Sequence, residues 1–311
     1  MSVLKRNVLP ALSPRLRNLL RFAVALGLLV LVWRMVDSAQ VMERLRDVHL
    51  GWIAAALLLL ALQTVLSALR WRLTAARLGH DLGLWRALRE YFLAQTVNLA
   101  LPGGVVGDAG RALRASVDAG LERAGQAVVF DRLAGQAALV FVTVLGVIAV
   151  LLFPGSVTVP QSIGLALLAI CAAVAVCYAI IASAGDRWPL IATWRRAARH
   201  AVFARGVWPW QLGLSLATVA ANLLAFAACA AAVGVWLSPL AIMVILPLVL
   251  FTMLLPLSIG GWGLREGAAV ALFPLAGATG ADGFAASACF GVVFMLSACS
   301  GLVLFLGPRR G

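Results

Sequence analysis

Two glycine-rich segments flanked by charged residues are the places where this sequence could do chemistry. The first spans residues 98–108 and, with the arginine that follows it, contains Asn98, Gly103, Gly104, Asp108 and Arg111. Pro102 is expected to end a helix here, and glycines let the backbone approach a ligand closely. The freed N–H groups would then bind an anion such as a phosphate, although the same pattern also fits ordinary helix punctuation in a cytoplasmic loop.

The second glycine-rich segment spans residues 256–267, directly after a strongly apolar stretch. Its candidate ligand-binding residues are Gly260, Gly261, Arg265 and Glu266. Ionisable side chains beside an intramembrane segment are costly, so this pair is a ligand site, a structural ion pair or part of a solvated loop. The two segments could also be corresponding parts of an internal inverted repeat, as in transporters whose broken helices converge on one site.

An adjacent acid and base, Asp131 and Arg132, lie near the start of the apolar stretch 125–152. A buried arginine is expensive without a counter-charge, so we expect Asp131 to orient Arg132 toward a phosphate group. The alternative is that Arg132 extends to the membrane surface. Gln63 and Asn222 lie in other apolar stretches, and we interpret them as interhelical hydrogen-bonding residues rather than ligands.

Residues for nucleophilic, metal-dependent or cofactor chemistry form no recognisable pattern in this sequence. The three histidines are scattered, and the five cysteines show neither CxxC nor Cys/His metal spacing. No GxSxG, Walker A or HExxH sequence is present. We therefore predict no catalytic residue, no bound metal and no cofactor.

These candidates must be positioned by membrane helices. Of the 311 residues, 63% are hydrophobic and only 12% are charged, whereas soluble domains are about 45–50% apolar and about 25% charged. A spanning helix needs about 20 mostly apolar residues. The stretches that qualify are about 19–36, 50–69, 125–152, 163–182, 209–234, 239–257, 266–281 and 284–306. The expected fold is an all-α polytopic integral membrane protein with about eight transmembrane helices and re-entrant broken-helix segments.

The formal net charge of +13 comes from 25 Lys and Arg against 12 Asp and Glu. Because these charges lie between long apolar stretches, the expected partners are anionic membrane lipids and not nucleic acid. Short cytoplasmic loops are enriched in Lys and Arg, so both termini are predicted to be cytoplasmic.

The basic loops share one side only if residues 88–106 enter and leave the membrane on the same face. A full crossing would put the basic 183–208 loop outside, so we predict a re-entrant segment whose irregular backbone is buried in protein or lines a wet cavity. One membrane domain is expected over residues 1–311, with a basic cytoplasmic segment at 1–18 and a second glycine-pair break at about 256–267.

The order of the motifs resembles that of the lysylphosphatidylglycerol synthase transmembrane region, also called the flippase-like family. The matching elements, over about residues 15–306, are Arg70-Trp71-Arg72, the stretch from Arg86 through Asp108 to Arg111, Asp131 to Gly135, and Ser258 to Gly267. The resemblance implies a bundle with re-entrant helices that, in lipid-aminoacylating members, flips the charged lipid between leaflets. In those members a soluble transferase domain follows, whereas this sequence ends at Gly311, so lipid aminoacylation is not expected from it. Asp131 stands where many relatives have Glu.

The leading hypothesis is a translocase for a lipid or lipid-linked molecule, not an enzyme, in a bacterial cytoplasmic membrane. In it, Arg111, Arg132 and Arg265 neutralise the phosphate of an anionic phospholipid or of a polyprenyl-phosphate-linked cargo. Two alternatives stay open: an intramembrane enzyme that modifies lipid headgroups, and a scaffold that holds a glycosyltransferase or synthase at the membrane. The sequence also leaves open a homo-oligomer or a partner lipid-modifying enzyme.

Overall fold

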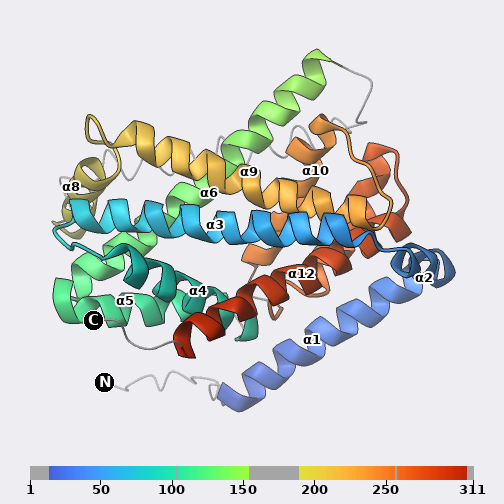
Figure 1. Cartoon of the computed structure of the whole chain (residues 1–311), viewed down its shortest axis with the longest axis horizontal. Coiled ribbons are helices and arrows are strands. Elements are labelled where there is room, and N and C mark those ends of the chain that lie inside the picture. The colour runs from blue at the N-terminus through green and yellow to red at the C-terminus, as the bar shows by residue number, and fades with distance from the viewer. Residues whose placement is uncertain (1–13, 102–103, 154–188, 256–257, 307–311) are drawn as a thin grey trace, which may run out of the picture.

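The computed structural model describes residues 14–101, 104–153, 189–255 and 258–306, and every regular element in these ranges is a helix (Figure 1). The α-helices are α1 (Pro14–Met35), α2 (Ser38–Arg46), α3 (Leu50–Arg77), α4 (Leu84–Ala100), α5 (Val106–Ala119), α6 (Leu121–Leu152), α8 (Pro189–Ala201), α9 (Trp208–Ala232), α10 (Pro239–Phe251), α11 (Leu264–Leu272) and α12 (Gly280–Leu306). Two short 3₁₀ helices are η1 (Thr252–Leu254) and η2 (Phe273–Ala276). The predicted all-α fold class is confirmed.

Four helices in the described ranges, α3, α6, α9 and α12, are long and apolar enough to cross a membrane. Helices α1 and α2 form a fifth candidate, although the chain bends by 98° between them. The expected spans at 19–36, 50–69, 125–152, 209–234 and 284–306 each fall largely within one of these helices. The span expected at 163–182 lies outside the described residues. The polytopic membrane architecture is therefore confirmed.

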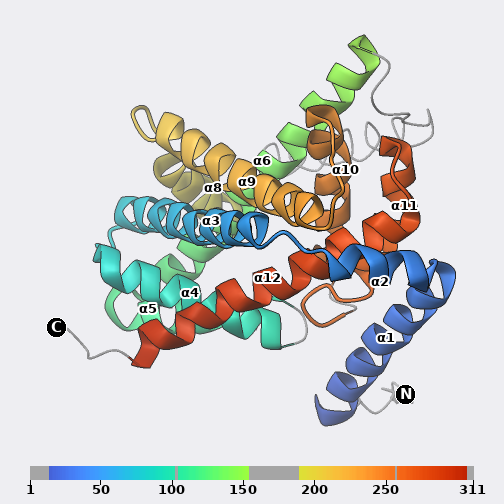
Figure 2. The ribbon, with the colours of Figure 1, turned by 45° about the vertical axis from the view of Figure 1, so that its right-hand side comes forward.

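Helices α3 and α9 run side by side through the centre of the molecule, and α12 lies along them (Figure 1, Figure 2). Ala225 and Ala230 of α9 are fully buried, and Phe226 stacks on Phe290 of α12 with ring centroids 4.5 Å apart. Small residues let helices approach closely, and this matters in lipid because association there depends on packing rather than on escape from water.

Helices α4 and α5 form an antiparallel hairpin. A Cβ on Gly107 would lie 2.0 Å from the Ala94 carbonyl oxygen, so only glycine permits this approach. Farther from the break, Arg114 Nε of α5 pairs with Glu90 Oε2 of α4 at 2.6 Å. With 17 residues, α4 is roughly 26 Å long, shorter than a hydrocarbon core of about 30 Å. The re-entrant segment expected at 88–106 falls across this hairpin, and its depth in a bilayer stays a prediction.

Helices α10 and α11 pack against each other and form a second broken hairpin. The Ser238 hydroxyl caps α10 by accepting from Ala241 N at 3.2 Å, and the helix passes into η1. Gly263 precedes α11 with a φ of +84°, and a Cβ there would lie 2.7 Å from Leu28 Cβ of α1. With 13 residues, α10 is roughly 20 Å long.

The two spans expected at 239–257 and 266–281 are therefore shorter than a full crossing. Helix α10 and η1 occupy the first, and the second holds most of the 9-residue α11 and η2. Two crossings were predicted from apolar content alone, which does not take into account the glycine-rich break that separates α10 and η1 from α11. The structure instead has a helix–break–helix element in this region.

The two hairpins start from opposite ends of α3, and their breaks meet in the middle. Helix α4 follows the carboxyl end of α3, whereas α10 follows α9, whose last turn lies beside the amino end of α3. There, His49 N donates to the Ala232 carbonyl oxygen at 2.9 Å. A Cβ on Gly260 would lie 2.9 Å from Leu99 Cδ1. Irregular backbone from both hairpins is thus gathered inside the bundle.

Candidate functional site

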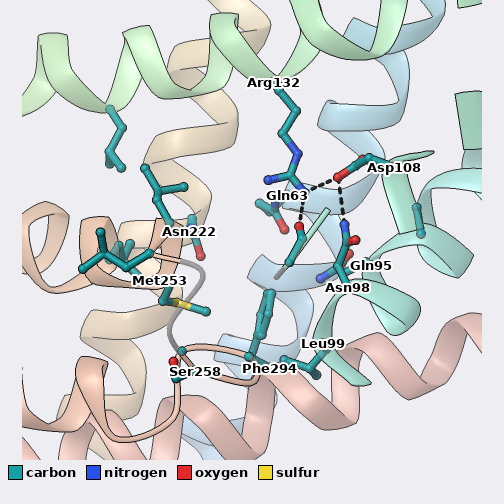
Figure 3. A pocket seen from close by; sticks show the side chains of 18 of the residues that line it. Gln63, Gln95, Asn98, Leu99, Asp108, Arg132, Asn222, Met253, Ser258 and Phe294 are labelled. Carbon is teal, nitrogen blue, oxygen red and sulfur yellow. Dashed lines mark hydrogen bonds and ion pairs between the residues drawn. The ribbon is translucent and has the colours of Figure 1, made fainter. Parts of the chain in front are cut away.

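A cavity of about 300 Å³ lies where the two breaks meet (Figure 3). Its polar lining consists of Gln63, Tyr91, Gln95, Asn98, Asp108, Arg132, Asn222 and Ser258. Its apolar lining includes Leu99, Leu139, Leu250, Met253, Leu254, Leu255, Phe290 and Phe294. Gly104, Gly260 and Gly261 bring backbone from both breaks to its wall. The cavity therefore combines a charged side with an apolar side.

Arg132 and Asp108 form the charged side of the cavity. One Nη of Arg132 contacts the Asp108 carboxylate and also donates to the Gly104 carbonyl oxygen at 2.6 Å. Asn98 Nδ2 donates to the same carboxylate at 2.8 Å, while Asn98 Oδ1 accepts from Gly107 N at 2.7 Å. Asn98 thereby satisfies an otherwise free N–H in the first turn of α5 and holds the two arms of the hairpin together.

A buried ion network lies behind this wall. Asp131 of α6 accepts from Arg70 Nε of α3 at 2.8 Å and from Arg111 Nη2 of α5 at 2.9 Å. The hydroxyl of Tyr91 of α4 also donates to this carboxylate, at 3.1 Å from Asp131 Oδ2. Arg111 Nε also lies 2.9 Å from Asp108 Oδ1, an ion-pair contact without hydrogen-bond alignment. One carboxylate thus joins four helices.

The Arg111 guanidinium lies between two aromatic rings. Its Cζ is 4.7 Å from the Trp71 ring centroid and 4.4 Å from that of Tyr91. Contacts of this kind between a guanidinium and aromatic rings partly replace the lost hydration of a fully buried cation.

A second buried ion cluster involves Arg265 and Glu266. The Arg265 guanidinium contacts Glu266 Oε1, and Arg265 Nε donates to Ser287 Oγ of α12 at 3.0 Å. Glu266 Oε2 accepts from Gly263 N at 2.7 Å, which caps the amino end of α11. Both charged side chains are fully buried and neither lines the cavity, although their neighbour Phe290 does. This cluster anchors α11 to α12.

The structure brings most of the predicted site residues to one place. Asn98, Gly104, Asp108, Arg132, Gly260 and Gly261 line the cavity. Arg111 and Asp131 lie behind its charged side, whereas Arg265 and Glu266 form their own cluster. Gly103 lies outside the described residues. Both glycine pairs predicted from the sequence thus contribute to the cavity lining, through Gly104, Gly260 and Gly261.

The expectation that Asp131 orients Arg132 is wrong. Asp108 contacts Arg132, and Asp131 instead holds Arg70 and Arg111. Neighbouring residues on a helix point about 100° apart, and on α6 this turns Asp131 toward Arg70 and Arg111 while Arg132 faces Asp108.

Sequence reasoning missed several polar residues of the site. Gln63 and Asn222 were interpreted as interhelical bonding residues, yet both line the cavity, and Gln63 Nε2 bonds only within its own helix, to Ser67 Oγ at 3.4 Å. Arg70 was identified only as part of the Arg70-Trp71-Arg72 motif and not as a site residue, although an ionisable residue inside an apolar helix must have a partner. That requirement was the signal that could have found it.

Within the described ranges, no group of three or more His, Cys, Asp or Glu side chains is arranged to hold a metal ion. The polar lining of the cavity consists of guanidinium, carboxylate, amide and hydroxyl groups. These groups bind and orient polar ligands.

Fold and site together define a polytopic helical membrane protein in which two broken hairpins surround a polar cavity. A family model for the lysylphosphatidylglycerol synthase TM region matches residues 18–299. The chain belongs to this family. No match was found among curated proteins.

Proposed function

We propose that this protein translocates a lipid or lipid-linked molecule with an anionic headgroup, which passes through the cavity between the two hairpin breaks. Membership of a family of lipid-associated membrane proteins supports the class of function. The observation that carries the proposal is the cavity itself, where Arg132 lies opposite an apolar lining. The headgroup of such a lipid needs a charged surface, and its tail needs an apolar one.

The charges around the cavity favour an anion. Arg70, Arg111 and Arg132 contribute three positive charges, and Asp108 and Asp131 contribute two negative charges, so one positive charge is in excess. Of these arginines, Arg132 has a side chain that is 34% exposed, whereas the side chains of Arg70 and Arg111 are 3% and 1% exposed. Arg132 is therefore the guanidinium that a phosphate would meet.

Exposed apolar residues flank both breaks and supply a path for the tail. Leu254 and Leu255 line the cavity and are 46% and 48% exposed. Leu101 and Val105, on the other break, are 40% and 56% exposed. A headgroup could occupy the cavity while its tail stays in the bilayer beside these residues.

The breaks also supply the moving parts of the proposed mechanism. Gly104, Gly260 and Gly261 all have positive φ, a conformation that glycine adopts without steric cost. Small movements of one hairpin against the other would open the cavity alternately toward each leaflet, without ATP.

We assign the end of the molecule that carries α5 and α8 to the cytoplasm. Figure 1 shows both helices at the end where α3 finishes, with α2 at the other end. The arginine-rich end includes Arg77, Arg86, Arg114, Arg123, Arg196, Arg199 and Arg205, whereas α2 and its flanks carry Arg44 and Arg46 against Asp37, Glu43 and Asp47. This asymmetry supports cytoplasmic termini in a bacterial inner membrane.

Reconstitution in vesicles tests the proposal. The purified chain is expected to accelerate the exchange of a fluorescent anionic lipid between leaflets, read by chemical quenching of the outer leaflet. Arg132→Gln should slow that exchange at least about tenfold, because a charged hydrogen bond to a phosphate contributes about 1.5–3 kcal/mol. Arg86→Gln is the matched control, since Arg86 pairs with Asp118 on the surface and both side chains are about half exposed. No acceleration by the unsubstituted protein would contradict the proposal.

A further inference from the structure

We infer that the headgroup accepted by this cavity is an anionic phosphate ester that also carries neutral hydroxyl groups, and not an aminoacylated or otherwise cationic headgroup. Phosphoglycerol and glycosyl phosphate headgroups share this chemistry. The inference rests on the proposed translocase function and specifies its substrate class.

The cavity has no free carboxylate for an ammonium group among its described lining residues. Asp108 is the acidic residue on its wall. That carboxylate already meets Arg111 Nε at 2.9 Å, Asn98 Nδ2 at 2.8 Å and the Arg132 guanidinium. An additional cation would enter a region with an excess positive charge, and a desolvated cation without an anion is strongly disfavoured.

Two of the three aromatic rings in the described lining, those of Tyr91 and Phe290, already meet arginines. Tyr91 has the Arg111 guanidinium 4.4 Å from its ring centroid. Phe290 has the Arg265 guanidinium at 5.7 Å and Phe294 stacked at 5.7 Å. An amine or quaternary ammonium headgroup would need a free aromatic face with no competing cation. These rings therefore do not form a cage for a cationic headgroup.

Unsatisfied neutral polar atoms surround the same cavity. Gln63 Oε1, Gln95 Nε2, Asn222 Oδ1 and Ser258 Oγ are buried and have no hydrogen-bond partner among the described residues. The residues that carry them come from α3, α4, α9 and the break before α11, and all four line the cavity. Each such atom leaves about 1–3 kcal/mol of desolvation unrecovered.

The types of these atoms specify what would satisfy them. Gln63 Oε1 and Asn222 Oδ1 are acceptors, which a phosphate group cannot satisfy because it too only accepts. Because the region already has an excess positive charge, these two oxygens need a hydrogen-bond donor that carries no positive charge. A hydroxyl group meets this need, and it can also accept from Gln95 Nε2 and exchange a hydrogen bond with Ser258 Oγ.

The size of the cavity agrees with a headgroup rather than a whole lipid. Its volume of about 300 Å³ lies at the lower limit of ligand pockets, which span about 300–1,000 Å³. A phosphate beside Arg132 with hydroxyls toward Gln63 and Asn222 uses both the charged and the neutral polar lining.

The test compares lipids that differ in headgroup hydroxyls at constant charge. The exchange rates of phosphatidylglycerol and phosphatidylpropanol, with the same labelled tails, are measured with the reconstituted full chain. Phosphatidylethanolamine and lysyl-phosphatidylglycerol are measured in parallel as lipids whose headgroups carry an ammonium group. We expect phosphatidylglycerol to move about tenfold faster than phosphatidylpropanol, which is the effect of one or two recovered hydrogen bonds. A further experiment with a polyprenyl-phosphoryl hexose distinguishes a phospholipid from a polyprenyl lipid with the same headgroup chemistry. Movement of either hydroxylated lipid faster than that of phosphatidylpropanol supports the inference.

Asn222→Leu should reduce the ratio of the phosphatidylglycerol rate to the phosphatidylpropanol rate from about tenfold toward one, because the acceptor for a headgroup hydroxyl is lost. Gln126→Leu is the matched control, because Gln126 bonds Glu122 within α6 at 3.2 Å and does not line the cavity. Thermal unfolding of both variants separates lost selectivity from lost folding.

Equal rates for hydroxylated and hydroxyl-free lipids, or faster movement of the amine-bearing lipids, would overturn the inference and leave the translocase function standing. No movement of any lipid above protein-free vesicles would overturn the function, and the inference with it.

Discussion

Arg132 and Asp131 are neighbours on α6, yet their side chains serve different contacts. Arg132 faces the cavity and is held by Asp108 and the Gly104 carbonyl oxygen. Asp131 is fully buried between Arg70 and Arg111. One turn of helix thus carries both the charge proposed to meet the ligand and the carboxylate that holds the surrounding helices together.

Asp131→Asn is expected to destabilise the protein strongly. The substitution leaves Arg70 and Arg111 buried without their shared counter-charge, and breaking a buried pair from one side costs about 3–5 kcal/mol. The thermal unfolding temperature in detergent measures the effect.

Asp118→Asn is the control for this substitution, since the Asp118 side chain is 47% exposed in its pair with Arg86. An exposed pair contributes about 0–1 kcal/mol, so little change is expected. Equal unfolding temperatures for the two variants would show that the buried network does not support the fold.

At the scale of the elements, the α4–α5 hairpin depends on one close helix contact. Gly107 packs against the Ala94 carbonyl, and Asn98 links the arms through both Asp108 and Gly107. Because Asp108 also contacts Arg132, the position of the hairpin sets the position of the cavity's guanidinium. The packing of a glycine is thereby connected to the geometry of the site.

Gly107→Ala is expected to separate the arms of the hairpin and to reduce both thermal stability and lipid exchange. The added Cβ would lie 2.0 Å from backbone oxygen, and overpacking of a tight contact costs about 1–3 kcal/mol. Gly125→Ala in α6 is the control, because no other atom lies within 4 Å of the added Cβ. Gly125→Ala should be neutral or stabilising, and a similar result for Gly107→Ala would argue against the close packing described.

The long helices and the two breaks of the bundle were predicted from local sequence patterns. Apolar length predicted the long helices, and the Gly104 and Gly260 regions were identified as breaks, with Asn98 and Asp108 among the polar residues that line the cavity. Asp108 as the partner of Arg132 was not predictable, because this contact depends on how α5 packs against α6. The same dependence on packing concealed the cavity-lining role of Gln63 and Asn222.

The two ends of the molecule are expected to face opposite sides of the membrane. Arg114 of α5, Arg196 of α8 and Arg46 of α2 are exposed and suit single cysteine substitutions. A membrane-impermeant thiol reagent added to intact cells should label Arg46→Cys, and should label Arg114→Cys and Arg196→Cys only after permeabilisation, with the unsubstituted chain as background. Labelling of Arg114→Cys in intact cells, from the same side as Arg46→Cys, would mean that the α4–α5 hairpin crosses the membrane.

Photocrosslinking from the headgroup tests most directly whether the cavity holds the transported lipid. A phosphatidylglycerol analogue with a photoreactive group on its glycerol is incorporated in native membranes, and the labelled residues are found by peptide mass spectrometry. Labelling is expected around Leu99, Leu139 and Met253, which line the cavity, and it should be lost in Arg132→Gln. Labelling confined to the outer faces of α1 and α8, unchanged by Arg132→Gln, would contradict this expectation.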